Sequence, residues 1–130
     1  MTSHPRLFSP YDEPMWSSIA AREMRLQRCA GCSAFRYPPG PACPGCLGVE
    51  ASWEPIAGSG RVLSWTTFHR QYLSAYPPPH SVVAVKLDEG PIMIGSVKPE
   101  HVAALAVDRA VRMVYVAHPD GYLLPAFEPA

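Results

Sequence analysis

The chain has 130 residues, and its 11 basic and 11 acidic side chains leave no net charge at neutral pH. This length suits one domain or a small domain with an appendage, and an apolar fraction of 48% can form a core and argues against long disorder. The charge balance disfavours a polycationic nucleic-acid-binding protein, and no apolar run approaches the roughly 20 residues that cross a bilayer.

The first predicted element is a helix over residues 9–24. Residues 1–10 lack the charged start and apolar stretch of a secretory signal, so we expect a cytoplasmic protein. Pro14 fits the first turn of a helix, and Met15 and Trp16 lie on its apolar side. This side covers either the chain's own core or a partner, and Met15 and Trp16 are candidate partner-contact residues.

All four cysteines follow the helix, in two C-x-x-C pairs separated by ten residues. The first pair is Cys29 and Cys32, and the second is Cys43 and Cys46. Two thiolates on one tight turn reach a single ion, and a second pair completes a tetrahedral shell that selects zinc. Because four sulfurs leave no open position for water or substrate, we expect a structural zinc that stabilises a small ribbon.

Other uses of the cysteines fit the sequence less well. Two disulfides need an oxidising compartment, a thioredoxin-like redox pair needs an α/β unit, and iron–sulfur clusters use other spacings. The proline-rich segment between the pairs contains Phe35 and Tyr37. These two rings either pack inside the ribbon or contact a partner, so both are candidate interface residues.

A flexible Gly-Ser-Gly joint at residues 58–60 precedes a segment rich in β-branched and aromatic residues. Before the joint, a short strand is predicted over residues 53–56; after it, strands are predicted over 61–70, 81–87, 92–97, 110–117 and 122–127, with a short helix over 99–105. The strands over 81–87 and 92–97 form a hairpin, and Gly95 suggests a bulge or bend. Five strands with a helix between the third and fourth give the element order of an OB-fold barrel.

The predicted chain is therefore mainly β. We expect an N-terminal helix within residues 1–24, a zinc ribbon over 25–57 and a five-stranded OB-fold barrel over 58–130.

The sequence offers no self-sufficient catalytic set. It has no nucleophile elbow, phosphate-binding loop, dinucleotide loop or zinc-protease helix, and no thiol remains once zinc takes four. His69 lies beside Arg70 in a predicted strand, where it either points outward or lines a shared active site. An independent enzyme is thus disfavoured.

Several stretches follow one another in a recognisable order from about residue 16 to the end of the chain. They are Met24–Cys29, Phe35–Pro39, Cys43–Cys46, Gly58–Val62 with Thr66 and His69, Val82–Gly90 and Leu124–Pro129. In this order they resemble a family of acyl-CoA-associated proteins first catalogued as a domain of unknown function (type 35), in which a rubredoxin-like zinc ribbon is joined to an OB-fold. Asp108 and Glu128 depart from that family's usual residues, which disfavours phosphate contacts there.

The resemblance implies a helper role. Similar proteins accompany thiolase-superfamily enzymes (thiolases, acyltransferases or aldolases) or are fused to hydratase-like domains, and the partner holds the catalytic residues. This chain would stabilise such a partner in a hetero-oligomer and close one wall of its CoA or acyl channel, for instance in steroid or lipid side-chain degradation. The candidate CoA or acyl contacts are Arg36, Arg61, His69 and Arg70, although each arginine could instead be solvated or paired with a partner.

Two other functions remain open at this point. OB-folds also bind single-stranded nucleic acid, and Trp65, Phe68 and Tyr72 are possible stacking residues, although Trp65 fits a core position equally well. The neutral charge counts against this function. The other alternative is an independent acyl-CoA enzyme that uses His69.

Overall fold

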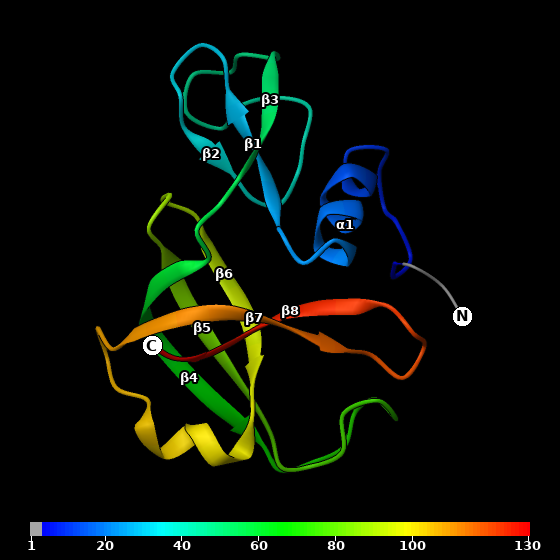
Figure 1. The fold of residues 1–130 in the computed structure, drawn as a ribbon, viewed down its shortest axis with the longest axis vertical. Helices are drawn as coiled ribbons and strands as arrows, with labels where there is room; N and C mark the ends of the chain where they lie inside the picture. The colour runs from blue at the N-terminus through cyan, green and yellow to red at the C-terminus, as the bar shows by residue number, and fades with distance from the viewer. Residues whose placement is uncertain (1–3) are drawn as a thin grey trace.

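The computed structural model describes residues 4–130 and confirms a mainly β chain (Figure 1). Its elements are α1 (Asp12–Ala20), β1 (Arg25–Cys29), β2 (Phe35–Arg36), β3 (Ala51–Pro55), β4 (Ser59–Phe68), β5 (His80–Leu87), β6 (Ile92–Val97), the 3-10 helix η1 (Pro99–Ala104), β7 (Ala110–Ala117) and β8 (Leu123–Pro129). No helix within these residues is long and apolar enough to cross a membrane.

Helix α1 is shorter than the predicted span of residues 9–24. It begins only at Asp12, whose carboxylate accepts the N–H groups of two preceding residues at 3.0 and 3.1 Å and so fixes a turn before the helix. It ends at Ala20 because Arg22 adopts a left-handed conformation (φ 59°) and donates its N–H to the carbonyl of Ile19. Met24 therefore lies in the link to β1, where it is buried, and not on the helix.

The ribbon is a three-stranded antiparallel sheet in the order β2-β1-β3. The predicted strand over residues 53–56 is β3, which begins two residues earlier. In the central strand, Gln27 lies opposite both Arg36 and Trp53. Gln27 accepts the N–H of Gly40 at 2.8 Å, and Arg36 donates to the carbonyl of Gly40 at 3.1 Å. These two buried polar side chains thus hold the proline-rich loop against the sheet.

The second part is a closed five-stranded barrel in the order β4-β5-β6-β8-β7, which confirms the OB-fold. The predicted hairpin is β5 and β6, and a single parallel bridge from Ser96 to Ala126 closes the barrel between β6 and β8. The predicted strand over residues 61–70 is wrong at its end. Strand β4 stops at Phe68, so His69 and Arg70 lie in the loop that follows.

The barrel core is filled by alternate residues of the strands. Its buried side chains include Val62, Val83, Val85, Leu87, Met93, Val111 and Phe127. Of the bulge or bend expected at Gly95, the bulge is absent: the register of β6 is regular, and the irregularity lies in β4 between Val62 and Ser64. Glycine occupies position 95 because a Cβ there would lie 2.9 Å from the ring of Phe127.

Helix, ribbon and barrel share one hydrophobic core. Met15 and Ile19 from α1 and Leu26 from β1 belong to the same buried cluster as the barrel residues. Two hydrogen bonds reinforce the junction: the N–H of Met24 donates to the hydroxyl of Tyr115 at 2.8 Å, and the N–H of Ala57 donates to the carboxylate of Glu89 at 2.9 Å. In Figure 1 the ribbon and α1 accordingly lie at the same end of the barrel.

Candidate functional site

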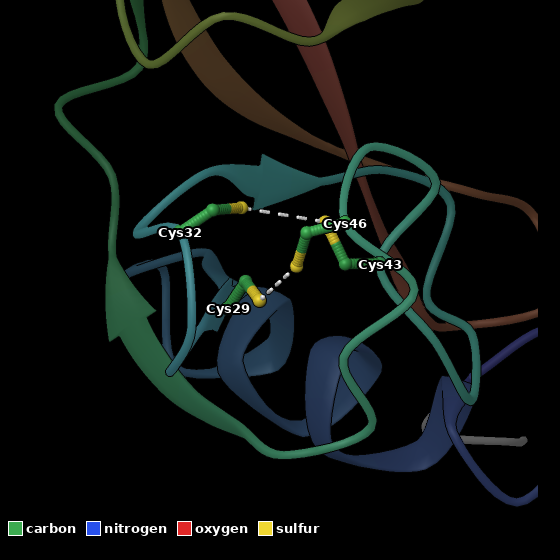
Figure 2. Close-up of side chains that lie close together, drawn as sticks. All are labelled: Cys29, Cys32, Cys43 and Cys46. Atoms are coloured by element: carbon green, nitrogen blue, oxygen red, sulfur yellow. Dashed lines mark hydrogen bonds between the residues drawn. The ribbon is translucent and has the colours of Figure 1, made fainter.

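The four cysteine sulfurs lie together at the far end of the ribbon (Figure 2). All four Sγ atoms are within 4.8 Å of one another, with 3.5 Å from Cys29 to Cys46 and 3.6 Å from Cys32 to Cys43. A tetrahedral zinc ion with Zn–S bonds of about 2.3 Å needs sulfurs about 3.8 Å apart, so the cluster fits it. All four are free thiols, which excludes the disulfide alternative in this structure.

Two equivalent turns present these sulfurs. The N–H of Ser33 donates to the carbonyl of Cys29 at 2.9 Å, and the N–H of Leu47 donates to the carbonyl of Cys43 at the same distance. Ser33 and Leu47 both adopt left-handed backbones, with φ values of 65° and 64°. The first cysteine of each pair also donates its own N–H at 2.8 Å to a carbonyl beyond the turn. Local backbone geometry alone therefore aims two thiols from each turn at one point.

The turns also favour the thiolate form that binds metal. The backbone N–H groups of Cys32 and Gly31 point at the sulfur of Cys29 and lower its pKa to about 6. In the second pair, the N–H groups of Cys46 and Gly45 lower the pKa of Cys43 in the same way. The N–H of Ala34 lowers the pKa of Cys32. The sulfurs of Cys43, Cys46 and Cys29 and the burial of the thiol together outweigh that effect and raise the pKa to about 11. The donor set suits zinc, which would stabilise the fold and hold no substrate.

The structure separates most of the candidate CoA contacts. Arg36 is only 3% exposed and donates to the proline-rich loop of the ribbon. Arg61 lies on β4 and donates to the carbonyl of Asp108 at 2.9 Å. His69 and Arg70 remain neighbours and are exposed in the loop after β4. Arg70 also lines a hollow beside this loop, whereas His69 is not among the residues that line it.

The candidate interface residues are unequally exposed. Met15 is buried in the chain's own core, which is the alternative that the sequence left open. Trp16, Phe35 and Tyr37 are half-buried and pack against that core. Burial, with a smaller contribution from Asp12, raises the pKa of the Tyr37 hydroxyl. Trp65 is 40% exposed, so it is not the core residue that a simple alternation allowed.

The structure also contains a row of aromatic rings, of which the sequence singled out Trp16, Phe68 and Tyr72 separately but not their arrangement in a row. The row runs through Trp16, Tyr122, His118, Tyr76, His80, Phe68 and Tyr72, with ring centres of neighbours 4.4 to 6.4 Å apart. It joins α1 to the loops before β5 and before β8. The sequence shows that aromatic residues flank these loops, but only the fold brings their rings into contact.

One histidine of the row bonds to a serine. The Nε2 atom of His80 lies 3.1 Å from the hydroxyl of Ser96 across β5 and β6. Within residues 4–130 no carboxylate bonds to the His80 ring, so the pair lacks the third group that orients the base in a catalytic triad.

Two family profiles match consecutive parts of the chain. Residues 16–51 match the rubredoxin-like zinc ribbon domain of ChsH2, and residues 53–116 match its C-terminal OB-fold domain. A probable enoyl-CoA hydratase alpha subunit from Thermomonospora curvata is 30% identical over 97% of this chain. A 3-oxo-4,17-pregnadiene-20-carboxyl-CoA hydratase alpha subunit from Mycobacterium tuberculosis is 32% identical over 88% of it. The chain spans only 40% and 36% of the length of these two relatives.

Solved structures give the same assignment. A chain of the Ltp2-ChsH2(DUF35) aldolase is 27% identical, with a TM-score of 0.81 over 97% of this chain and 98% of that one. A DUF35 family protein of unknown function from Sulfolobus solfataricus, 13% identical, shares the fold with a TM-score of 0.60 over 82% of this chain and 78% of that one. Together with the profiles and the four-sulfur cluster, these matches confirm the predicted family and its zinc cofactor. The chain belongs to the ChsH2 (DUF35) family, in which a rubredoxin-like zinc ribbon is joined to an OB-fold.

Proposed function

We propose that this chain is a non-catalytic accessory subunit of a cytoplasmic acyl-CoA-processing complex. It binds and stabilises a thiolase-like partner, which holds the catalytic residues, and it forms part of the wall of the partner's CoA or acyl channel. The observation that carries the proposal is the likeness, over nearly the full length of both chains, to a chain of the Ltp2-ChsH2(DUF35) aldolase.

The chemistry of the chain supports a helper role. A four-thiolate shell leaves its metal no open position, so zinc supplies stability and no Lewis acid for substrate. The His80–Ser96 pair has no orienting carboxylate within the described residues. A shaped apolar face and a rigid ribbon can still exclude water from a thioester site that another protein completes.

The experiment is capture of a tagged full-length chain from its source organism. We expect a thiolase-superfamily protein to elute in a fixed ratio with it, and we expect that protein to lose solubility or acyl-CoA turnover when expressed alone. A chain that elutes alone and monodisperse, or that turns over acyl-CoA without a partner, contradicts the proposal. Absence of binding to single-stranded oligonucleotides at low salt would remove the nucleic-acid alternative.

The hydratase relatives favour a second candidate, a subunit of an acyl-CoA hydratase complex. The same capture distinguishes the two. A partner that adds water to an enoyl-CoA only in the presence of this chain supports the hydratase complex, whereas a partner that makes or breaks a carbon–carbon bond supports the thiolase-like complex.

A further inference from the structure

The third strand of the zinc ribbon has one edge without a partner. In the sheet order β2-β1-β3, strand β3 pairs with β1 on one side only. The hydrogen-bonded pairs of this ladder can be read from its two ends: the N–H of Ile56 donates to the carbonyl of Met24 at 3.1 Å, and the N–H of Ala30 donates to that of Glu50 at 2.9 Å. Because such pairs alternate along antiparallel strands, the backbone groups of the even-numbered β3 residues face β1, and those of the odd-numbered residues face outward.

The outward-facing groups are left free by the rest of the chain. Within residues 4–130 no hydrogen bond reaches the N–H of Ala51 or of Trp53, and the carbonyl of Trp53 has only a long contact with the Arg25 guanidinium at 3.5 Å. Just beyond the strand the same edge does have a partner, because the N–H of Ala57 donates to the carboxylate of Glu89 at 2.9 Å. The edge is thus closed where the barrel reaches it and open along β3 itself.

The two edges of the ribbon sheet differ. The opposite edge is β2, which has only two residues and is followed directly by Tyr37, Pro38 and Pro39. Short strands and prolines block an edge, because a proline has no N–H to donate. Strand β3 has five residues, and its only proline is the last of them, Pro55. In Figure 2, β3 is the green strand on the side of the cluster away from the second cysteine pair, and its edge can accept a further strand.

The side chains beside this edge define the chemistry of its partner. Glu50, Ser52 and Glu54 alternate with the outward-facing residues, so they share one face of the sheet. The Glu54 side chain is 40% exposed and forms only a surface pair with Arg28 at 3.4 Å, and no basic side chain among residues 4–130 pairs with Glu50. The opposite face carries the alanine, the tryptophan and the proline of β3. A strand with basic residues on one face and apolar residues on the other complements this edge.

The same charges disfavour a second copy of this chain as the partner. In an antiparallel pair of two β3 strands, the register that joins Ala51 of one copy to Trp53 of the other also places Glu50 opposite Glu54. Like charges that lie directly opposite each other on neighbouring strands are destabilising. The edge therefore fits a strand of a different protein.

A hollow adjoins the start of this edge. It has a volume of about 300 Å³ and is lined by Ala30, Gly31, Gly48, Val49 and Glu50. Val49, at the rim of the hollow, is 75% exposed. When a strand is added to a sheet edge, main-chain hydrogen bonds give affinity and pockets for side chains give specificity. An apolar side chain in this hollow would fix the register of the added strand.

We infer that the free edge of β3 binds an extended segment of another protein, in which basic and apolar residues alternate. The segment adds a fourth strand to the ribbon sheet. Its main-chain groups bond to Ala51 and Trp53, its basic side chains lie beside Glu50 and Glu54, and one apolar side chain fills the hollow. This site lies on the ribbon and does not rest on the accessory function proposed above.

The test uses the full zinc-loaded chain and a blocked hexapeptide of alternating lysine and valine, followed by amide NMR. We expect chemical-shift changes centred on Ala51 and Trp53, and slower exchange of these two amides with solvent when the peptide is bound. N-methylation of the two valines that face them should weaken binding about tenfold or more, because main-chain hydrogen bonds are lost. A peptide with glutamate in place of lysine should bind several-fold more weakly, because Glu50 and Glu54 repel it.

Variants of the chain locate the site. Glu50→Lys reverses a charge beside the edge and should weaken binding of the lysine peptide several-fold. Glu100→Lys is the matched control, since Glu100 is exposed on η1 of the barrel and the same charge change there should leave binding unchanged. Ala51→Pro removes an outward N–H but no bond of the β1–β3 ladder, so it should weaken binding about tenfold while the zinc content and the other ribbon amides stay unchanged.

Four results overturn the site: no binding at millimolar peptide, shifts centred on the barrel, undiminished binding of the N-methylated peptide, or equal losses in Glu50→Lys and Glu100→Lys. Dimerisation of the chain that is lost in Ala51→Pro would identify a second copy as the occupant and contradict the inference. A chain that captures a thiolase-like partner but never binds the peptide refutes this inference alone. A chain that binds the peptide at β3 but captures no thiolase-like partner refutes the proposed function alone.

Discussion

At the scale of single residues, hydrogen bonds from polar side chains hold in place segments that belong to no strand pair. Gln27 and Arg36 both bond to Gly40, and Glu89 bonds to the N–H of Ala57 in the link between ribbon and barrel. None of these partnerships could be predicted from the sequence, because each joins residues whose proximity depends on the completed fold. The cysteine ligands could be predicted, because their spacing along the chain already determines their geometry.

Gly95 is needed for packing. In Gly95→Ala the new Cβ would lie 2.9 Å from the ring of Phe127, so we expect a loss of about 1–3 kcal/mol in the free energy of unfolding, measured with denaturant. Gly40→Ala is the matched control, because a Cβ there meets nothing within 4 Å. Equal stability of the two variants would mean that Phe127 does not fill this position.

Tyr115 should stabilise the junction through its hydroxyl. Tyr115→Phe removes the acceptor of the Met24 N–H and should cost about 1 kcal/mol, while Tyr122→Phe, whose hydroxyl makes no such bond, should cost less. Burial raises the pKa of Tyr115, so the unfolded chain ionises first and stability should fall as the pH rises above about 10. The fall should be smaller in Tyr115→Phe, and an unchanged pH profile would contradict this role.

At the scale of elements, the β signals of the barrel were predictable because alternation and β-branched residues are local. The ends of α1 were not, because a polar turn before Asp12 and a left-handed Arg22 decide them. Strands β1 and β2 were missed for a related reason. They are short, and the buried positions Gln27 and Arg36 carry polar residues, so no apolar pattern reveals them.

Zinc should control the order of the ribbon but not of the barrel. Chelation should expose the amides of β1 to β3 to hydrogen exchange while the β5–β6 hairpin stays protected, since the ribbon depends on metal binding worth about 10–16 kcal/mol in comparable peptides. Because zinc binds the thiolates in competition with protons, acidification should release it. A chromogenic chelator measures the release, and an unchanged ribbon after metal loss would contradict the structural role.

At the scale of the whole molecule, one core joins parts that the sequence presents as separate. Met15, Ile19 and Leu26 share a buried cluster with Val62 and Phe127, so helix, ribbon and barrel are coupled by packing. An aromatic-lined hollow is a product of this arrangement, because its walls come from α1, the ribbon and the barrel. The sequence predicted the parts, but it could not predict the hollow, which exists only where they meet.

This coupling predicts a single cooperative unfolding of the zinc-loaded chain. Met24→Ala empties a fully buried position at the junction and should cost about 2–5 kcal/mol, whereas Leu47→Ala, at a side chain 74% exposed, should be nearly neutral. Fluorescence of Trp53 in the ribbon, measured in a variant with Trp16 and Trp65 replaced by Phe, and circular dichroism of the same variant should report the same midpoint. Two separate midpoints would mean that ribbon and barrel are independent.

The most direct test of the account is native mass spectrometry of the tagged chain purified with whatever it binds. We expect a hetero-oligomer in which each copy of this chain carries one zinc ion and is joined to a thiolase-superfamily protein. A metal-free chain, or a zinc-loaded chain that is found only alone or with copies of itself, would contradict it.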